Sequence, residues 1–595
     1  MAKAESKFKQ TRWSLTDLFP SSHSPEFKQA LKEIESKVAE FEKVRKELSA
    51  DLQPKRFLEI IILLEEILKL RGRLGAYAEL WFAEDTQNQN AQTLVGQMQQ
   101  MDADFENRVL FFSLWWKELE ATAARKLIAV SGDYRYWLEK MRDLKPFSLS
   151  EPEEKIINIK DVTGMRALVT LYDSITNRFT FKLRVDGKEK ELTRGEIMSY
   201  IYQPDPQVRA EAYQEVYRIY KDQAPILGQM YQTLARDWHS EQVNLRKFKT
   251  SIAARNLFND IPDDVVSTML RACQENIGVF QRYFKVKAKW LGIPKLRRYD
   301  IYAPVAKSTK IYDFSVASEL VLDAFREYDP QFAELALRVF ESNHLDSEVR
   351  KGKRSGAFCA DIIPGLTPWV LVNFNQQPED VATLAHELGH SIHDMLTGHL
   401  TAFTNHPCLP LAETASTFSE MMLVDRLLKE EEDEGVRRDL LFKQVSDSYA
   451  TIMRQAFFSL FEQEAHELIA DGVNVEKLSE AYFQNLKTQF GESLELGDEF
   501  HWEWVSIPHF YHTPFYVYAY SFGQLLVLSL YHQYKQGGES FKPRYKQILS
   551  AGGSLAPQRI LADAGIDIHQ ADFWQGGFNV IDDLVRQLEQ MQVKK

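Results

Sequence analysis

The chain has 595 residues, of which 44% are hydrophobic, so it is long enough to bury a large core in one large or two moderate domains. Its formal net charge of −13 argues against a nucleic-acid partner, because such partners are usually bound by a basic patch. The three cysteines, Cys273, Cys359 and Cys408, are widely spaced and odd in number, which excludes a disulfide framework.

The sequence predicts a cytoplasmic protein without a membrane partner. The first residues lack the apolar stretch of a secretory signal. The most apolar window, residues 57–70, carries Glu59, Glu65, Glu66 and Lys69 at helical spacing, so it predicts an amphipathic helix rather than a membrane span.

Helical periodicity dominates the first 150 residues. Apolar residues recur with a 3.6-residue period in residues 27–48, 57–70 and 91–119, and Pro54 separates the first two segments. These patterns predict three amphipathic helices.

A β-hairpin is predicted next, because the strand-like residues 179–185 and 188–192 flank the turn sequence Asp186-Gly187. Helical patterns resume at Thr193 and again from Gln207. We therefore place a domain boundary near residue 195.

Two short extended runs follow later in the chain. Pro368 begins an apolar run that ends at Phe374 and is typical of a strand. Upstream of it, Gly356 and Ala357 lie among small residues, which allow another backbone to approach and pair with a strand edge. A bulge or turn without a ligand is the alternative interpretation.

The helix predicted from Asp380 to Leu396 contains the H-E-x-x-H motif His386-Glu387-Leu-Gly-His390. Residues four apart lie on one face of a helix, so the two histidines can direct imidazole nitrogens at one Zn²⁺ ion. Glu387 lies beside them, where it can take a proton from a metal-bound water. The motif predicts a catalytic zinc site.

Catalytic zinc sites use three protein ligands and leave a fourth position open. The metzincin pattern needs glycine at position 393 and histidine at position 396, but this chain has His393 and Leu396, so that class is excluded. The remaining common solution is a glutamate on a later helix, and Glu413 opens a helical pattern that continues through Glu420. We expect Glu413 rather than Glu420 to be the third ligand of one Zn²⁺ ion per chain.

Three nearby residues are expected to support this site. Glu420 lies two turns after Glu413 on the same face, where it would orient a ligating histidine, with a structural carboxylate as the alternative. His393 is expected to lie beside the ligands, since a fourth protein ligand would close the open position. Gly389 costs about 1 kcal/mol relative to alanine in a helix, which indicates close approach of substrate or metal, or close helix packing.

These segments resemble peptidase family M3, which includes thimet oligopeptidase, neurolysin and the bacterial oligoendopeptidase F group. The metal motif is followed by Glu413-x-x-Ser416, as in that family. The oligoendopeptidase F branch in particular is resembled by four further segments, which are Trp13 to Phe19, Leu149 to Glu154, Gly352 to Cys359 and Ile507 to Tyr520. The resemblance runs in order over nearly the whole chain.

The resemblance implies a mainly α-helical, neurolysin-like metallopeptidase fold. Two helical lobes would surround a deep substrate channel, with a small β-sheet beside the active-site helix. Residues 1–195 would form an oligoendopeptidase F-type N-terminal lobe with the hairpin near its end, and residues 196–595 the M3 catalytic domain.

The resemblance also implies roles for the late tyrosine-rich segment. By their positions, His509 and Tyr518 match the histidine and tyrosine that stabilise the oxyanion in related peptidases. Tyr511 and Tyr516 are further candidates for substrate contact. Gly356 and Ala357, named above, would bind the peptide backbone.

The implied function is a zinc metalloendopeptidase that hydrolyses internal bonds of short, unfolded oligopeptides through zinc-activated water, with Glu387 as the general base. Its partners would be oligopeptide substrates, and the oligomeric state is left open. One alternative is a zinc carboxypeptidase or dipeptidyl peptidase on a similar helical scaffold, which would capture a peptide terminus. A non-catalytic helical peptide-binding protein is the other.

Overall fold

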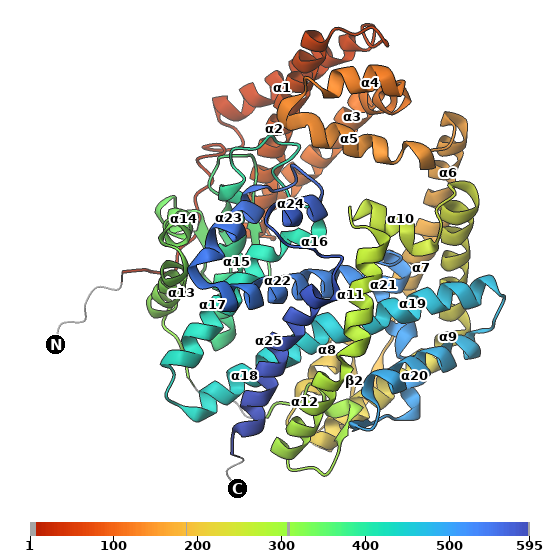
Figure 1. Cartoon of the computed structure of the whole chain (residues 1–595), viewed down its shortest axis with the longest axis vertical. Helices are drawn as coiled ribbons and strands as arrows, with labels where there is room; N and C mark the ends of the chain where they lie inside the picture. The colour runs from red at the N-terminus through yellow and green to blue at the C-terminus, as the bar shows by residue number, and fades with distance from the viewer. Residues whose placement is uncertain (1–6, 186, 306–309, 593–595) are drawn as a thin grey trace. The chain divides into compact units, whose positions relative to one another are not determined.

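The computed structural model describes residues 7–185, 187–305 and 310–592 (Figure 1). Within them the chain is mainly α-helical with a few short strands, which confirms the predicted fold class. The chain forms two compact units, each assembled from three separate stretches. Unit 1 comprises Met1–Pro146, Lys310–Glu430 and Tyr534–Ile566, and unit 2 comprises Phe147–Thr309, Glu431–Gln533 and Asp567–Lys595. The domain boundary near residue 195 and the substrate channel stay predictions.

Unit 1 is a set of helices with one small sheet. Its helices are α1 (Pro25–Val44), α2 (Pro54–Glu84), α3 (Gln89–Glu118), α4 (Ala121–Ile128), α5 (Arg135–Asp143), α13 (Phe314–Tyr328), α14 (Pro330–Glu341), α15 (Pro378–Leu396), α16 (Leu409–Ala412), α17 (Thr414–Glu430), α23 (Lys542–Ser550) and α24 (Pro557–Asp563), with 3-10 turns at Gly132–Tyr134 and Gly538–Ser540. The three N-terminal helices predicted from periodicity are α1, α2 and α3.

Helix α1 shows how local sequence sets these elements. The Ser24 hydroxyl oxygen accepts the backbone N–H of Phe27, and Pro25 occupies the first turn, where its missing N–H costs nothing. Phe27, Ile34 and Phe41 recur at helical spacing and are buried against α2 and α3. The apolar stripe therefore fixes which face of α1 enters the core.

A three-stranded sheet lies beside α15 in unit 1. The central strand β6 (Trp369–Leu371) pairs in parallel with β4 (Leu345–Asp346) and antiparallel with β5 (Phe358–Ala360). The buried strand β6 confirms the strand predicted from the apolar run after Pro368. Because β5 lies at the edge of the sheet, its outer backbone groups face away from β6.

The N-terminal segment forms hydrogen bonds with residues in and next to this sheet. The Ser347 N–H donates to the Thr11 carbonyl at 2.9 Å, and the Thr11 N–H donates to the Ser347 hydroxyl at 3.1 Å. The indole N–H of fully buried Trp369 donates to the Ser14 carbonyl at 2.8 Å. Residues far apart in the sequence thus fix the strands that lie beside α15.

Unit 2 is also helical. Its helices are α6 (Glu151–Thr163), α7 (Met165–Thr176), α8 (Arg194–Ser199), α9 (Pro206–Trp238), α10 (Ser251–Phe258), α11 (Asp263–Glu275), α12 (Ile277–Trp290), α18 (Glu434–Ser448), α19 (Arg454–Ala470), α20 (Val475–Phe490), α21 (Pro508–His512) and α25 (Ala571–Gln590). Helix α22 (Tyr518–Gly537) begins in this unit, and π-helical segments follow α9 at His239–Leu245 and α18 at Tyr449–Met453. The 3-10 segments are Tyr200–Tyr202, Arg298–Asp300 and Asp498–Ser506.

Two strand pairs and a buried ion pair complete unit 2. Strands β1 (Phe181–Val185) and β2 (Lys188–Leu192) are antiparallel and confirm the predicted hairpin, although residue 186 of its turn lies outside the described residues. Strands β3 (Leu296–Arg297) and β7 (Leu494–Glu495) pair in parallel. In the core, Arg298 donates to Glu503 at 2.8 Å, and both side chains are at most 2% exposed.

Across the part of the chain that the structure describes, no helix has both the length and the apolar character needed to cross a bilayer.

Candidate active site

Helix α15 and the residue before α17 carry the predicted metal ligands, and the two helices pack closely at Gly389. A Cβ atom added at Gly389 would lie 2.7 Å from the Ser416 Cα and 2.8 Å from the Ala415 carbonyl oxygen. Both atoms belong to the backbone of α17, so no side-chain rotation would relieve the clash. The structure therefore supports close helix packing as the reason for glycine at this position.

The structure brings His386, His390 and Glu413 together. The two histidines lie one turn apart on α15 with ring centroids 4.9 Å apart, and Glu413 immediately precedes α17. The Glu413 Oε2 atom lies 3.4 Å from His386 Nε2 and 3.5 Å from His390 Nε2. Bonds of about 2.1 Å in a tetrahedral zinc site separate neighbouring ligand atoms by about 3.4 Å, so this spacing suits such an ion.

Hydrogen bonds orient two of these three side chains. The Nδ1 atom of His386 lies 2.5 Å from Glu420 Oε1, and a proton on Nδ1 leaves Nε2 free to face Glu413. The Ser416 hydroxyl donates to Glu413 Oε2 at 2.8 Å. The predicted supporting position of Glu420 is therefore matched by a direct contact.

The charges of the cluster favour a cation at its centre. Burial lowers the pKa of His386, but the hydrogen bond and charge of Glu420, with Glu413, raise it overall to about 9. Burial raises the pKa of Glu413, but His390, His386 and Ser416 lower it overall to about 2. A divalent ion that binds here would take the place of protons on the histidines.

Glu387 is 6% exposed and lies in the wall of a pocket that His386, His390 and Glu413 also line. Burial raises the pKa of its carboxyl group, and the charges of His386 and His390 partly offset this increase. A carboxylate with a raised pKa is a better proton acceptor near neutral pH than an exposed one.

The open pocket around these residues has a volume of about 450 Å³. Its lining is formed by Ala357, Phe358, Cys359, Ala360, Asp361, His386, Glu387, His390, Asp394, His406 and Glu413. Ala357 lies directly before the edge strand β5, and Gly356 precedes it with a φ of +82°, which favours glycine. The amide of Asn373 donates to the Gly356 carbonyl at 2.8 Å and fixes this turn.

His393 faces a different neighbour. It is 4% exposed, and burial lowers its pKa to about 4, opposed by hydrogen bonds to the backbone of Leu549 and Ala412. These contacts pack α15 against α23, so His393 supports the position of the helix, while its contribution to the metal site stays a prediction.

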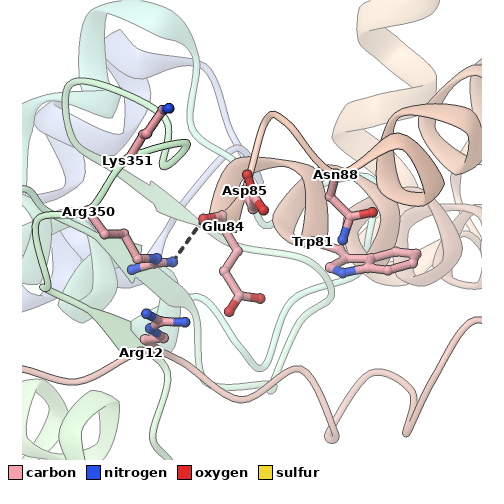
Figure 2. A pocket seen from close by; sticks show the side chains of 7 residues that line it. All are labelled: Arg12, Trp81, Glu84, Asp85, Asn88, Arg350 and Lys351. Atoms are coloured by element: carbon pink, nitrogen blue, oxygen red, sulfur yellow. Dashed lines mark hydrogen bonds between the residues drawn. The ribbon is translucent and has the colours of Figure 1, made fainter.

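A second pocket of unit 1 is shown in Figure 2. It is lined by Arg12, Trp81, Glu84, Asp85, Asn88, Arg350 and Lys351. Arg350 donates to the Glu84 carbonyl, as the dashed line marks, and to the Asp346 carboxylate. This lining contains neither histidine nor cysteine, so the pocket with His386 and His390 is the candidate active site.

The late tyrosine-rich segment belongs to unit 2. His509, on α21, is half-buried, and burial lowers its pKa. Its Nε2 atom lies 3.4 Å from the hydroxyl of Tyr520, which is 37% exposed. The ring of Tyr516 meets that of Tyr520 edge-on at 5.3 Å. These three side chains form one polar, aromatic group.

Tyr511 and Tyr518 are buried instead. The Tyr511 ring stacks on Tyr172 with centroids 3.8 Å apart and is 1% exposed, so it packs in the core, and its substrate contact stays a prediction. Tyr518 is 0% exposed, and its hydroxyl oxygen accepts a hydrogen bond from Asn259 at 2.9 Å. Its oxyanion role stays a prediction that requires the hydroxyl to leave Asn259.

A buried carboxylate fixes the turn between His509 and α22. Phe515 has a φ of +57°, which is rare for a residue with a side chain, and its N–H donates to Glu462 Oε1 at 2.8 Å. Arg255 donates to the Pro514 carbonyl at 3.0 Å. Burial raises the pKa of Glu462 to about 8. These contacts hold a strained backbone between the candidate residues of this segment.

Tyr520 and the group formed by Asp361, Asp394 and His406 lie close to the candidate residues but were not predicted from the sequence. Asp394 follows His390 by four residues and continues the ligand face of α15, so helical spacing was a usable signal for it. Asp361 and His406 come from other segments and had no such signal.

Comparison with known proteins identifies the family. The family model described as peptidase family M3 matches residues 199–580, which is more than half of the chain. The chain belongs to peptidase family M3. It is therefore a peptidase, and the family is one of metallopeptidases. A further model, described as oligopeptidase F, matches residues 116–181 of this M3 peptidase.

Several relatives of this M3 peptidase match over nearly their whole length. It is 26% identical to the oligopeptidase PepF of Bacillus subtilis, with 100% of the chain and 88% of that protein covered. It is 27% identical to the group B oligopeptidase PepB of Streptococcus agalactiae, with 90% of each covered.

Solved structures share the fold of this M3 peptidase. A structure described as a peptidase from Chlamydophila abortus matches with a TM-score of 0.88 at 23% identity, over 97% of each chain. The oligoendopeptidase-F of Enterococcus faecium matches with a TM-score of 0.70 at 23% identity, over 95% of this chain and 98% of that one.

Proposed function

We propose that this M3 peptidase is a zinc metalloendopeptidase that cleaves internal bonds of short, unfolded oligopeptides. The observation that carries the proposal is the cluster of His386, His390 and Glu413, whose facing atoms lie 3.4 and 3.5 Å apart. Relatives that are named oligopeptidases align with nearly the whole chain and support the substrate class.

The donor set favours zinc. Two imidazoles and one carboxylate match catalytic zinc sites with three protein ligands, whereas magnesium and calcium prefer oxygen ligands alone. We assign one Zn²⁺ per chain to His386, His390 and Glu413. When bound, the ion supplies Lewis-acid chemistry, because it polarises a carbonyl group and lowers the pKa of water.

Glu387 is the proposed general base. Its buried carboxylate accepts a proton from the attacking water and then delivers that proton to the nitrogen of the leaving amine. Burial raises the pKa of Glu387, which makes its carboxylate a stronger proton acceptor than an exposed one. Glu420 holds the Nδ1 side of His386, so that Nε2 is directed at the ligand cluster, and Ser416 fixes one oxygen of Glu413.

Other residues are proposed to hold the substrate. Gly356 and Ala357 lead into the edge strand β5, where an extended peptide can add as a further strand. His509 is proposed to stabilise the oxyanion, together with Tyr518. Tyr520 is the alternative tyrosine, because its exposed hydroxyl already lies beside His509.

The test compares wild-type protein, Glu387→Gln and the control Glu379→Gln, which replaces an exposed carboxylate on the same helix. Mixed peptides are incubated with and without chelator, and products are identified by mass spectrometry. We expect internal cuts that chelator abolishes, and a loss of at least 100-fold in rate for Glu387→Gln with the metal still bound.

Each alternative predicts another result. Removal of terminal residues alone would indicate an exopeptidase, and no cleavage by folded, zinc-loaded protein would indicate a peptide-binding protein. Near-wild-type turnover of Glu387→Gln would remove the general-base assignment. The cytoplasm is kept as the proposed location, which cell fractionation would test.

A further inference from the structure

A second group of ionisable side chains lies in the pocket of the metal-binding cluster. Asp361 directly follows β5, Asp394 follows His390 by one turn on α15, and His406 lies in the loop before α16. The ligand-type atoms of Asp361, Asp394 and His406 lie within 4.8 Å of one another. All three side chains line the candidate active-site pocket.

Specific contacts hold the two carboxylates in place. The Asn405 amide donates to Asp361 Oδ2 at 2.7 Å, and the Cys359 thiol donates to Asp394 Oδ2 at 3.5 Å. The Asp361 side chain is 5% exposed, whereas that of His406 is 60% exposed and lies 3.8 Å from Asp361. Asp361 therefore lies deep in the wall, and the histidine lies toward solvent.

These two carboxyl groups have little compensating positive charge, which disfavours their charged form. Burial raises the pKa of Asp361, with an opposing effect of His406, and burial together with Asp361 raises the pKa of Asp394 well above its usual value. Within residues 7–185, 187–305 and 310–592, neither carboxylate has a lysine or arginine as an ion-pair partner. A cation that enters the pocket would offset the cost of burying both groups.

The other residues of the pocket indicate which molecule would carry this cation. The wall of the pocket also contains His386, His390 and Glu413, so the peptide substrate of an M3 peptidase must enter it to be cleaved. One helical turn separates His390 from Asp394, which corresponds to about 6 Å along the axis. An extended peptide advances about 3.3 Å per residue, so this distance spans about two substrate residues.

The course of β5 supports the same position. A peptide that pairs with the edge of β5 runs past Ala360 and reaches Asp361, the next residue of the chain. The substrate path and the carboxylate pair therefore meet at the end of this strand.

We propose that Asp361 and Asp394 form a subsite that binds a cationic group of the substrate within about two residues of the cleaved bond. The group is an ammonium or guanidinium, carried by a lysine or arginine side chain or by the peptide N-terminus. This subsite rests on the proposed function, because it takes a peptide as the ligand of the pocket. It would give the peptidase a preference for basic peptides.

The test measures peptide binding to full-length, zinc-loaded Glu387→Gln protein by fluorescence anisotropy, so that binding is observed without cleavage. Peptides of one length carry a single lysine at successive positions, or norleucine in its place, with a free or acetylated N-terminus. We expect one cationic position to strengthen binding at least tenfold. Loss of this gain with norleucine assigns a side chain, and loss on acetylation assigns the N-terminus.

Variants then assign the preference to the pair. Added to the Glu387→Gln protein, Asp361→Asn or Asp394→Asn should reduce the gain to less than about threefold, so that the affinity for the cationic peptide falls more than that for the neutral peptide. Glu379→Gln serves as the matched control and should keep the full gain. The lysine series with the Glu387→Gln protein still tests whether a cationic position strengthens binding, even where an asparagine variant does not fold.

Three results would overturn the subsite. The first is equal affinity for neutral and cationic peptides at every position, and the second is an equal loss of both affinities in the asparagine variants. The third is a second equivalent of metal that Asp394→Asn removes, which would make the group a metal site. Failure of the proposed function is separate, since it means that wild-type protein cleaves no peptide, whatever the binding preference.

Discussion

The variant Gly389→Ala would test whether the contact between α15 and α17 sets the geometry of the metal site. The added Cβ would lie 2.7 Å from Ser416 Cα and 2.8 Å from the Ala415 carbonyl oxygen. Carbon atoms in contact prefer about 3.5–4.0 Å, so the helices must separate by roughly 1 Å. The carboxylates near the start of α17 would move by a similar distance relative to the histidines of α15.

Two opposing effects set the expected loss of stability. Overpacking of a close contact costs about 1–3 kcal/mol, whereas alanine gains about 1 kcal/mol over glycine inside a helix. The free energy of unfolding should therefore fall by up to about 2 kcal/mol. Zinc affinity should fall by at least about tenfold, because a shift of roughly 1 Å is large beside metal bonds of about 2.1 Å.

Gly96→Ala is the matched control. Gly96 lies within α3 of the same unit, is exposed, and has no atom within 4 Å of an added Cβ. This substitution should raise the free energy of unfolding by about 0.5–1 kcal/mol and leave zinc affinity unchanged.

The assay combines denaturant unfolding of the metal-free proteins with competition between each protein and a chromophoric zinc chelator. Hydrolysis of one peptide at saturating zinc completes the comparison. If Gly389→Ala were as stable as Gly96→Ala and bound zinc as tightly, the close contact would not determine the metal geometry.

Three further substitutions test other contacts. Glu420→Ala should lower zinc affinity by about 10–100-fold in the same competition assay, with a smaller loss for Glu420→Gln; wild-type affinity in the alanine variant would contradict the role of the bond to His386. Glu503→Ala should lower the free energy of unfolding by about 3–5 kcal/mol in denaturant unfolding, because Arg298 would stay buried without its partner. Unchanged stability would contradict a stabilising role of this ion pair. Glu462→Ala should lower kcat by about tenfold while Glu462→Gln, which keeps an oxygen for the N–H of Phe515, retains most activity; equal losses would count against this hydrogen bond.

Features with local causes could be predicted from the sequence. Helix α15 follows from its apolar spacing, and a helix places His386 and His390 on one face whatever surrounds it. Glu413 was predicted because it begins the next helical pattern after the motif, and the structure places its carboxylate 3.4 Å from His386. The hairpin followed from two strand-like runs and the Asp-Gly turn between them.

Features that depend on distant packing could not be predicted. Tyr518 and Tyr520 are two residues apart at the start of α22 and point to different sides of the helix. Tyr518 is held by Asn259, a residue far from it in the sequence, and no local pattern predicts that contact. Asp361 and His406 likewise approach Asp394 through the packing of two loops, which no local pattern encodes.

The interleaved construction of unit 1 also has a consequence for biosynthesis. The ligands on α15 and at Glu413 depend on the third stretch of the unit, where the Tyr545 hydroxyl donates to the Thr414 carbonyl at 2.9 Å. A ribosome that adds about 5–20 residues per second needs roughly 8–30 s to go from Glu413 to Ile566, the end of that stretch. During this interval the ligands have left the ribosome without their final support. Stable metal binding is therefore expected only late in translation. A fragment expressed as residues 199–580 would lack the first stretch of unit 1, which packs against the sheet beside α15.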